Sequence, residues 1–258
     1  TDFSGSPENR RHNIKVGAMA FNGVLIKPGE EFSMLKYLGE VDASSGYLPE
    51  LVIKEDRTVP EFGGGLCQVS TTMFRAALKT GLKITERQNH SYRVRYYEPP
   101  VGMDATIYIP KPDFKFLNDF ETPILIQASV GTNTLTFSFY GTKDGRRAET
   151  TEPVVWDVTG SGEAVYTESA DLAAGEIKQI EKPHPGSKAS FEYRVYDVSG
   201  KLINEQKFAS SYVPWPARYL YGPGTTGIPG QEQPAEPATQ AQPTQEPTPT
   251  PEDTSRKN

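Results

Sequence analysis

The sequence predicts an α+β fold in which a cysteine-bearing helix packs on an antiparallel sheet, followed by a small all-β module and a disordered tail. The helix is predicted because apolar residues recur at helical spacing directly after a glycine run, Gly63–Gly65. The sheet is predicted because apolar and polar residues alternate over 124–128 and 135–139, on either side of the turn sequence Gly131–Thr134. Alternation returns at 191–196, which predicts the strands of the module.

The chain divides into three predicted parts. A turn-rich, charged stretch at 141–147 separates the first region, residues 1–145, from a strand-rich region at 150–222. Residues 223–258 are rich in Pro, Gln, Thr and Glu and almost free of large apolar side chains. Because such a segment buries too little apolar surface to offset its ordering entropy, we expect a disordered tail there.

The composition argues against several classes of function. The formal net charge is −6, from 27 basic and 33 acidic residues, whereas nucleic-acid-binding modules usually carry a basic excess. The single cysteine, Cys67, allows no internal disulfide and no cysteine-rich zinc site. We recognise no signal peptide and no apolar run of roughly 18 residues, so no membrane-spanning helix is predicted within these residues.

Two helices are predicted in the first region. His12–Phe21 carries apolar residues at helical spacing, and Asn22–Gly23 suits a helix end. The second helix begins at Leu66 and ends before Gly81, which stands where a left-handed C-terminal residue belongs.

Cys67 falls in the first turn of the second helix, where the position itself has chemical consequences. Unpaired N–H groups and the positive end of the helix dipole favour a thiolate there. The same turn offers backbone N–H groups to a developing oxyanion, and the candidates are Gly64, Gly65 and Gln68. The alternative is an inert cysteine that packs as a small hydrophobic residue.

A base for this thiol is predicted after the helix. His90 lies in a segment expected to be an extended strand, on the face that carries the large apolar side chains and points toward the helix. Asp104 follows the Pro99–Gly102 turn, at the start of an expected strand over 105–109, and could hold one imidazole nitrogen. Nucleophile, base and orienting carboxylate then follow in chain order. A hydrogen-bonded structural histidine is the alternative.

Substrate-binding candidates lie nearby. Basic residues dominate 75–95 and would attract a carboxylate-bearing substrate, with Arg87, Arg93 and Arg95 as the candidates for contact. A solvated surface is the alternative interpretation of such a run.

Weaker hypotheses concern the same region. Ser70 and Thr71 either line the cleft or hydrogen-bond to carbonyls of their own helix. The glycine run lacks the Lys and Ser/Thr of a phosphate-binding loop, which argues against nucleotide binding. Spacing matches no known zinc motif, although four side chains could in principle be ligands: Cys67, His90, Asp104 and His12. We therefore expect no metal and no organic cofactor.

Several strings in the first region resemble VanW-like domains. The similarity covers roughly residues 5–142, and the string Gly63–Thr72, which contains the cysteine, is the most specific. The other strings that resemble the family are Arg10–Ile14, Leu25, Pro28–Glu30, Phe32–Ser33, Glu86–Ser91 and Asp104–Thr106. Residues 153–222 are similar, more loosely, to the G5 domains that often follow.

The resemblance implies a bacterial, exported cell-envelope protein, in a family named for its association with glycopeptide-resistance gene clusters. Some VanW-like domains act as L,D-transpeptidases, which form 3–3 cross-links between peptidoglycan stem peptides. By that analogy Cys67 is the nucleophile, His90 the base and Asp104 the orienting residue, and the partners are stem peptides. Members commonly carry an upstream membrane anchor, which would be the only membrane contact.

The expected reaction is acyl transfer through a thioester on Cys67. One alternative is hydrolysis of the same thioester by a peptidoglycan peptidase or amidase of the Cys–His type. The other is a non-catalytic wall-binding protein in which the cysteine is structural. In L,D-transpeptidases of the YkuD type the base precedes the nucleophile, whereas here it follows, so a shared activity would be convergent. This order looks more like papain-like and transglutaminase-like enzymes, an analogy at the level of fold alone.

Overall fold

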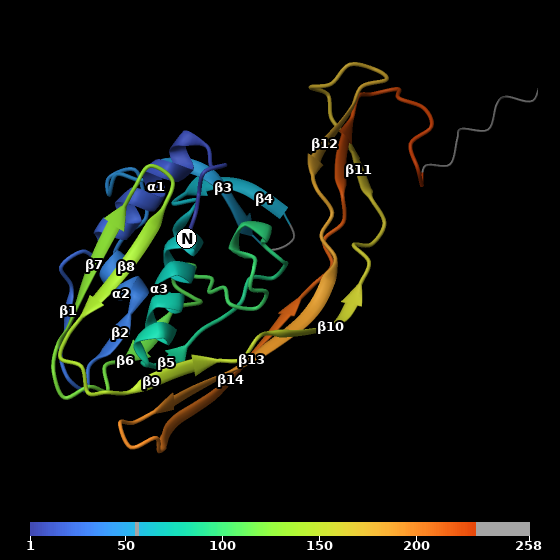
Figure 1. The fold of residues 1–258 in the computed structure, drawn as a ribbon. Helices are drawn as coiled ribbons and strands as arrows, with labels where there is room; N and C mark the ends of the chain where they lie inside the picture. Colours follow the sequence, from blue (N-terminus) through green and yellow to red (C-terminus); the bar gives the residue numbers. More distant parts are fainter. Residues whose placement is uncertain (55–56, 231–258) are drawn as a thin grey trace, which may run out of the picture. The chain divides into compact units, whose positions relative to one another are not determined.

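The computed structural model describes residues 1–54 and 57–230. They divide into two compact units, of which the first contains Thr1–Val165 and Gln179–Tyr219 and the second the described part of the remainder. The fold is α+β, with few helices and several small sheets, as the sequence predicts (Figure 1). Most of the predicted tail, residues 231–258, lies outside the described residues.

The helices all belong to the first unit. They are α1 (Glu8–Met19), α2 (Met34–Leu38) and α3 (Leu66–Thr80), with a short 3₁₀ helix at Arg95–Tyr97. The first nine strands are β1 (Leu25–Ile26), β2 (Glu31–Ser33), β3 (Pro49–Lys54), β4 (Arg57–Phe62), β5 (Lys83–Glu86), β6 (Lys115–Leu117), β7 (Ile124–Val130), β8 (Leu135–Tyr140) and β9 (Arg147–Thr150). The later strands are β10 (Val154–Thr159), β11 (Val165–Glu168), β12 (Ile177–Glu181), β13 (Gly186–Tyr196), β14 (Leu202–Tyr212) and β15 (Arg218–Tyr221).

The strands pair into small sheets. Antiparallel pairing gives the orders β1–β7–β8 and β2–β6–β5 and the hairpin β3–β4, which confirms the predicted hairpin of β7 and β8. β13 and β14 form a long antiparallel ribbon, with β10 and β9 paired to β13 (Figure 1). β11, β15 and β12 form a further sheet in that order. The strand predicted from the alternation at 191–196 is therefore confirmed as part of β13.

Helix α3 is bounded by glycine at both ends, as predicted. Gly65 precedes it with a φ of +114° and Gly81 follows it with a φ of +84°, a region that favours glycine. Close packing also requires glycine before the helix, because a Cβ on Gly65 would lie 3.0 Å from Ile14 Cγ1 and 3.1 Å from Arg10 Cγ. The start of α3 is therefore fixed tightly against α1.

The core of the first unit forms around α3. The helix packs against α1 on one side and against β5, β8 and β9 on others. Val69, Met73 and Phe74 are fully buried, and burying each such side chain contributes on the order of 1.5–3 kcal/mol. This packing holds the N-terminus of α3, and with it Cys67, in one place.

The β13–β14 ribbon belongs to the same core. Phe191 stacks on Phe208 with ring centres 5.1 Å apart, and Phe74 of α3 meets Phe208 edge-on at 5.5 Å. The first compact unit therefore extends past the boundary predicted between 145 and 150. The division into domains 1–145 and 150–222 stays a prediction about sequence modules, because these modules share one core.

Two predicted strands are wrong. The segment that contains His90 is irregular and leads into the 3₁₀ helix, and residues 105–109 are irregular too. One backbone hydrogen bond joins the two segments, from the Thr106 N–H to the Gln88 carbonyl at 2.8 Å. Proline has no N–H to extend a ladder, and prolines follow both segments directly: Pro99, Pro100, Pro110 and Pro112.

Candidate active site

Cys67 is the second residue of α3, at the positive end of the helix dipole. The Leu66 N–H donates to the Gly63 carbonyl and the Gln68 N–H to the Gly65 carbonyl, each at 3.0 Å. The prediction that Gln68 offers an N–H to an oxyanion is therefore wrong, because that group is already bonded. The N–H of Cys67 itself has no hydrogen-bond acceptor among the residues that the structure describes.

The glycine turn before α3 is held by its surroundings. A Cβ on Gly64 would lie 2.8 Å from Glu50 Cβ and 2.9 Å from the Leu51 carbonyl oxygen. The side-chain amide of Asn13, in α1, donates to the Gly64 carbonyl at 3.2 Å. Gly64 and Gly65 remain the predicted oxyanion donors, and the free N–H of Cys67 is a third candidate that the sequence did not indicate.

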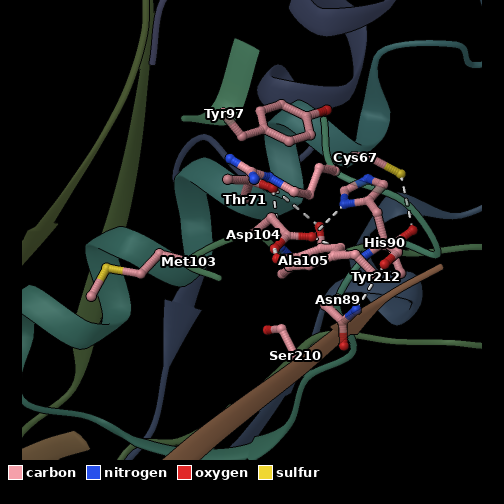
Figure 2. Close-up of polar contacts among 12 residues, drawn as sticks. Cys67, Thr71, Asn89, His90, Tyr97, Met103, Asp104, Ala105, Ser210 and Tyr212 are labelled. Carbon is pink, nitrogen blue, oxygen red and sulfur yellow. Dashed lines mark hydrogen bonds and ion pairs between the residues drawn. The ribbon is translucent and has the colours of Figure 1, made fainter. Parts of the chain in front are cut away.

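The Cys67 sulfur has three polar neighbours. The Thr106 hydroxyl oxygen lies 3.3 Å from it, and the thiol donates to the Ile107 carbonyl at 3.6 Å. The charge of the His90 imidazole also acts on the sulfur. Figure 2 shows the His90 ring between the Cys67 sulfur and the carboxylate of Asp104.

Asp104 fixes the orientation of the His90 ring. Its Oδ2 accepts from the His90 backbone N–H at 2.7 Å and lies 2.6 Å from His90 Nδ1. Both side chains are buried, with 4% and 5% of their surface exposed. Because Nδ1 is bound to the carboxylate, Nε2 is the ring nitrogen left to interact with sulfur. The Tyr97 ring, 5.2 Å from the imidazole, packs on the same ring.

The environment favours the charged forms of both Cys67 and His90. Burial by itself would raise the pKa of the thiol, but the charge of His90 and hydrogen bonds from His90 and Thr106 outweigh it and lower that pKa to about 7. Burial would lower the pKa of His90, but the Cys67 charge and the bond to Asp104 raise it to about 9. A thiolate–imidazolium pair is therefore favoured between these values.

The Asp104 carboxylate has partners on both oxygens. Its Oδ1 accepts from the Tyr212 hydroxyl, at the end of β14, and lies 3.3 Å from Arg87 Nη2. Burial would raise the pKa of Asp104, but its bond and charge interaction with His90, followed by Arg87 and Tyr212, hold it well below the usual range. Asp104 is therefore ionised at all pH values at which the pair described above exists.

A cavity of about 620 Å³ opens beside Cys67 and His90. Its walls are mostly apolar and aromatic, which suits a ligand with methyl groups and an alkyl chain. The lining includes Leu35, Leu38, Val41, Leu51, Phe62, Val94, Tyr96, Tyr97 and Ile107. Polar side chains at its wall include Arg10, Gln88 and Lys111, together with one carboxylate, that of Glu61.

Arg10 supplies a fixed positive charge at the cavity wall. Its Nη1 donates to Ser6 Oγ at 2.6 Å and to Gln68 Oε1 at 2.9 Å, and its guanidinium lies 4.8 Å from the centre of the Tyr96 ring. These contacts leave Nε and Nη2, and no carboxylate partner is found among the described residues. Such a group can accept a carboxylate from a ligand.

The predicted substrate-binding arginines lie elsewhere. Arg87 is buried, its side chain 3% exposed, and donates to the carbonyls of Gly102 and Asp104 at 2.8 and 2.6 Å. Arg93 forms a two-pronged ion pair with Glu98 at 2.6 and 2.9 Å. Neither lines the cavity, so the structure does not bring them to the place where Cys67 and His90 are exposed, and their contact with substrate stays a prediction. The side chain of Arg95 lies outside the described residues.

Ser70 and Thr71 also face away from the cavity. Thr71 exchanges hydrogen bonds with the backbone of Ala105, donating to its carbonyl at 3.2 Å and accepting from its N–H at 3.1 Å. The buried Ser70 Oγ has no partner in the part of the chain that the structure describes. Thr71 thus holds the segment after Asp104 against α3, and the prediction that these hydroxyls line the cleft is wrong.

The described residues contain no set of side chains arranged as zinc ligands. His12 Nε2 lies 2.8 Å from the Gly46 carbonyl oxygen. Within residues 1–54 and 57–230, no three His, Cys, Asp or Glu side chains gather as metal ligands would. Across the same residues, no helix is both long and apolar enough to cross a membrane.

Comparison with protein families shows to which family this chain belongs. Residues 9–140, which carry Arg10, Cys67, His90 and Asp104, match the family model described as VanW like protein. The chain belongs to the VanW family.

Two curated relatives match half of the chain or somewhat less. An uncharacterized protein, YoaR, of Bacillus subtilis (strain 168) is 38% identical over 128 residues, which is 50% of this chain and 42% of that protein. The vancomycin B-type resistance protein VanW of Enterococcus faecalis (strain ATCC 700802 / V583) is 36% identical over 116 residues, 43% of this chain and 42% of that protein. The match thus spans less than half the length of either relative.

Among solved structures, two G5 domains are similar to a part of this chain. HP0197-G5 has 15% sequence identity and a TM-score of 0.16, covering 30% of this chain and 97% of that one. The G5 domain of IgA1 protease has 19% identity and a TM-score of 0.18, covering 30% of this chain and 86% of that one. At these scores the G5-like character of the module stays a prediction.

The VanW-family region does not contain every residue of the site. Thr106 and Arg10 lie inside it and belong to strings that resemble the family, so the sequence carried a signal for them that chemical reasoning did not use. Tyr212 lies well beyond it. No local pattern in the sequence indicates that a strand of the later module contacts Asp104.

Proposed function

We propose that this VanW-family chain is a cysteine acyltransferase of the L,D-transpeptidase type, which forms 3–3 cross-links between peptidoglycan stem peptides. One observation carries the proposal: a sulfur at a helix N-terminus and an imidazole lie at the wall of a cavity, and a buried carboxylate binds the imidazole from the other side. A relative named as a vancomycin resistance protein supports a role at the cell wall. The nucleophile–base order is that of papain-like and transglutaminase-like enzymes.

Acylation begins with the Cys67 thiolate. Its sulfur attacks the carbonyl carbon that joins the third stem residue, a diaminopimelate or lysine, to D-Ala, and forms a C–S bond. The oxyanion that develops would lie near the N–H groups of Cys67, Gly65 and Gly64. The His90 imidazolium gives its Nε2 proton to the nitrogen of D-Ala as the C–N bond breaks. D-Ala leaves as a free amine, and a thioester remains.

Transfer reverses the roles of the same groups. An amine from a neighbouring stem attacks the thioester carbonyl, and the neutral His90 takes one of its protons. The C–S bond breaks, an amide forms, and Cys67 and His90 return to the thiolate–imidazolium state. Asp104 stays ionised throughout and stabilises the imidazolium that each cycle regenerates.

The cavity suits a stem peptide donor. Its apolar lining can take the alkyl chain of the third residue and the methyl of D-Ala, and Arg10 offers two donors for a stem carboxylate. This assigns to Arg10 the role that the sequence suggested for Arg87, Arg93 and Arg95. Because the substrate is the cell wall, the proposed location is extracytoplasmic, in the cell envelope.

Intact-mass spectrometry tests the proposal. The full chain is incubated with a synthetic tetrapeptide stem, with a carbapenem as a second acylating probe, and compared with Cys67→Ala, which exchanges one small side chain for another. We expect an adduct on the wild-type chain that is absent from the variant. No adduct with either probe would refute acyl transfer and leave the non-catalytic wall-binding alternative.

The same reaction separates transfer from hydrolysis. When an acceptor stem with a free side-chain amine is added, transfer yields a cross-linked dimer, whereas a peptidase yields trimmed monomer whose carboxyl carries an oxygen from water. Mass analysis of the products in ¹⁸O-labelled water distinguishes the two. Labelled monomer as the main product at saturating acceptor would replace the transpeptidase by a hydrolase.

A further inference from the structure

The β13–β14 ribbon reaches the carboxylate that orients His90. Tyr212, the last residue of β14, is 4% exposed, and its hydroxyl donates to Asp104 Oδ1. Asp104 Oδ2 is meanwhile occupied by the backbone N–H and Nδ1 of His90. The two oxygens of one carboxylate therefore connect a strand outside the VanW-family match to the base inside it.

Hydrogen bonds on both sides of His90 hold the end of the same strand. The Asn89 side-chain amide donates to the Ser211 carbonyl at 2.9 Å, and the Val213 N–H donates to the Ser91 carbonyl at 2.8 Å. The residues before and after His90 are thus bonded to the residues before and after Tyr212. Since the His90 segment belongs to no sheet, these bonds replace the ladder that would otherwise hold it.

Arg87 adds a third connection between the ribbon and the carboxylate. Its Nη1 donates to Ser210 Oγ at 3.0 Å while its Nη2 faces Asp104 Oδ1. Without the Tyr212 hydroxyl, the carboxylate could turn about its Cβ–Cγ bond toward the guanidinium. Its Oδ2 would then move away from His90 Nδ1, and the imidazolium would lose part of its stabilisation.

We propose that Tyr212 is a positioning residue: through its hydrogen bond to Asp104, strand β14 holds the carboxylate, and hence His90, in the orientation that activates Cys67. The active site of this chain is accordingly completed from outside the VanW-family region. The inference rests on the cysteine chemistry of the proposed function, but it concerns the thiol–imidazole pair and not the substrate.

Other ionisable groups face the same buried centre and must be considered in any pH measurement. They come from α3, from the segment after β5, from the 3₁₀ helix and from β14, and they are Cys67, Arg75, Arg87, Tyr96, Tyr97 and Tyr212. The two arginines keep their charge over the working range, and burial raises the pKa of the three tyrosines above it. A profile between pH 5 and 10 therefore reports Cys67 and His90.

The test is the rate of Cys67 alkylation by iodoacetamide as a function of pH, in the full chain and in Tyr212→Phe. Phenylalanine keeps the ring and removes the hydroxyl alone. We expect the lower limb of the profile to move to higher pH by roughly half a unit or more, and the rate of peptide acylation to fall about tenfold through kcat, with KM unchanged. A profile identical to that of the wild type, or one moved to lower pH, would overturn the inference.

Tyr193→Phe is the matched control. Tyr193 is also buried on the ribbon, but its hydroxyl donates to the Leu82 carbonyl at 2.9 Å and not to Asp104. Its loss should lower the melting temperature and leave the alkylation profile in place, so an equal shift in both variants would also overturn the inference. Alkylation needs no substrate, so a shift specific to Tyr212→Phe with no peptide adduct would support the inference and refute acyl transfer.

Discussion

The hydroxyl oxygen of Thr106 lies 3.3 Å from the sulfur of Cys67, close enough to donate a hydrogen bond to a thiolate. Thr106→Val keeps the shape of the side chain and removes that donor. Because the bond helps to lower the pKa of Cys67, we expect the thiol pKa to rise by roughly half a unit to one unit. The thiolate absorbance near 240 nm, followed against pH, measures this directly.

A threonine of the same chain gives the control for that experiment. Thr136 is exposed on β8, and Thr136→Val should leave the thiolate titration where it is. If Thr106→Val also leaves it unchanged, the hydroxyl does not donate to the sulfur, and the proximity of the two atoms has no electrostatic consequence.

The rate of acylation should depend on pH as a bell. The reactive state needs Cys67 deprotonated, which holds above about 7, and His90 protonated as the donor to the leaving amine, which holds below about 9. The value of kcat/KM should therefore rise through the first of these values and fall through the second. Stopped-flow acylation with an activated stem peptide gives the profile.

Removing the imidazole should move the lower limb of this bell to higher pH. In His90→Gln the burial of Cys67 is no longer opposed by a positive charge, so its pKa should return to 9.0 or above, and alkylation at pH 7.5 should slow by at least about tenfold. A wild-type limb already centred near the free thiol value of about 8.5 would contradict the thiolate–imidazolium pair.

The sequence predicted the part of the site that local signals encode. Two glycines with positive φ bound α3, and the helical spacing between them made the position of Cys67 at an N-terminus predictable. His90 and Asp104 were predicted as partners from chain order and chemistry, and the structure places His90 Nδ1 2.6 Å from Asp104 Oδ2. Their roles in catalysis stay predictions.

The rest of the site depends on contacts between residues far apart in the chain. Arg87 was assigned to substrate because its charge is visible in the sequence, whereas the carbonyls of Gly102 and Asp104 that bury it are not. The strand expected at His90 is absent, and isolated backbone bonds and side-chain bonds, among them that of Asp104 to the His90 N–H, hold the segment in place of a ladder. Tyr212 meets Asp104 across 108 residues of chain, a separation at which alternation and motif spacing carry no information.

Stability should depend on pH through Asp104. Its pKa is lowered in the folded state, so its stabilising contribution is fully present above the ordinary value of 3.8 and is lost as the pH falls through the folded value. Asp104→Asn leaves Arg87 buried without a counterion, and we expect it to lower the free energy of unfolding by about 3–5 kcal/mol at pH 7. The difference between variant and wild type should shrink at pH 3.

Urea unfolding at both pH values measures this dependence, with Asp144→Asn as the control. Asp144 pairs with Arg146 at the surface, its side chain 41% exposed, and breaking such a pair should cost less than about 1 kcal/mol. A loss for Asp104→Asn as small as that of the control would show that the buried carboxylate contributes no net stability.

Substrate recognition should depend on Arg10. In Arg10→Gln the cavity loses a charged donor, and the loss of a hydrogen bond to a charged group, about 1.5–3 kcal/mol, should raise KM for a carboxylate-bearing stem by about ten- to a hundredfold. For the same stem with its carboxylates amidated, KM should hardly change in the variant. This comparison separates recognition of charge from disturbance of the Ser6 and Gln68 contacts that Arg10 also makes.

Arg11 is the matched control for that comparison, because it lies on the same helix and does not line the cavity. Its guanidinium donates to the Ser6 and Ser4 carbonyls and to Asn133 Oδ1, so Arg11→Gln should lower stability without changing KM for either stem. If Arg10→Gln raised KM equally for the free and the amidated stem, Arg10 would act on the shape of the cavity wall, and the carboxylate would have to be recognised elsewhere.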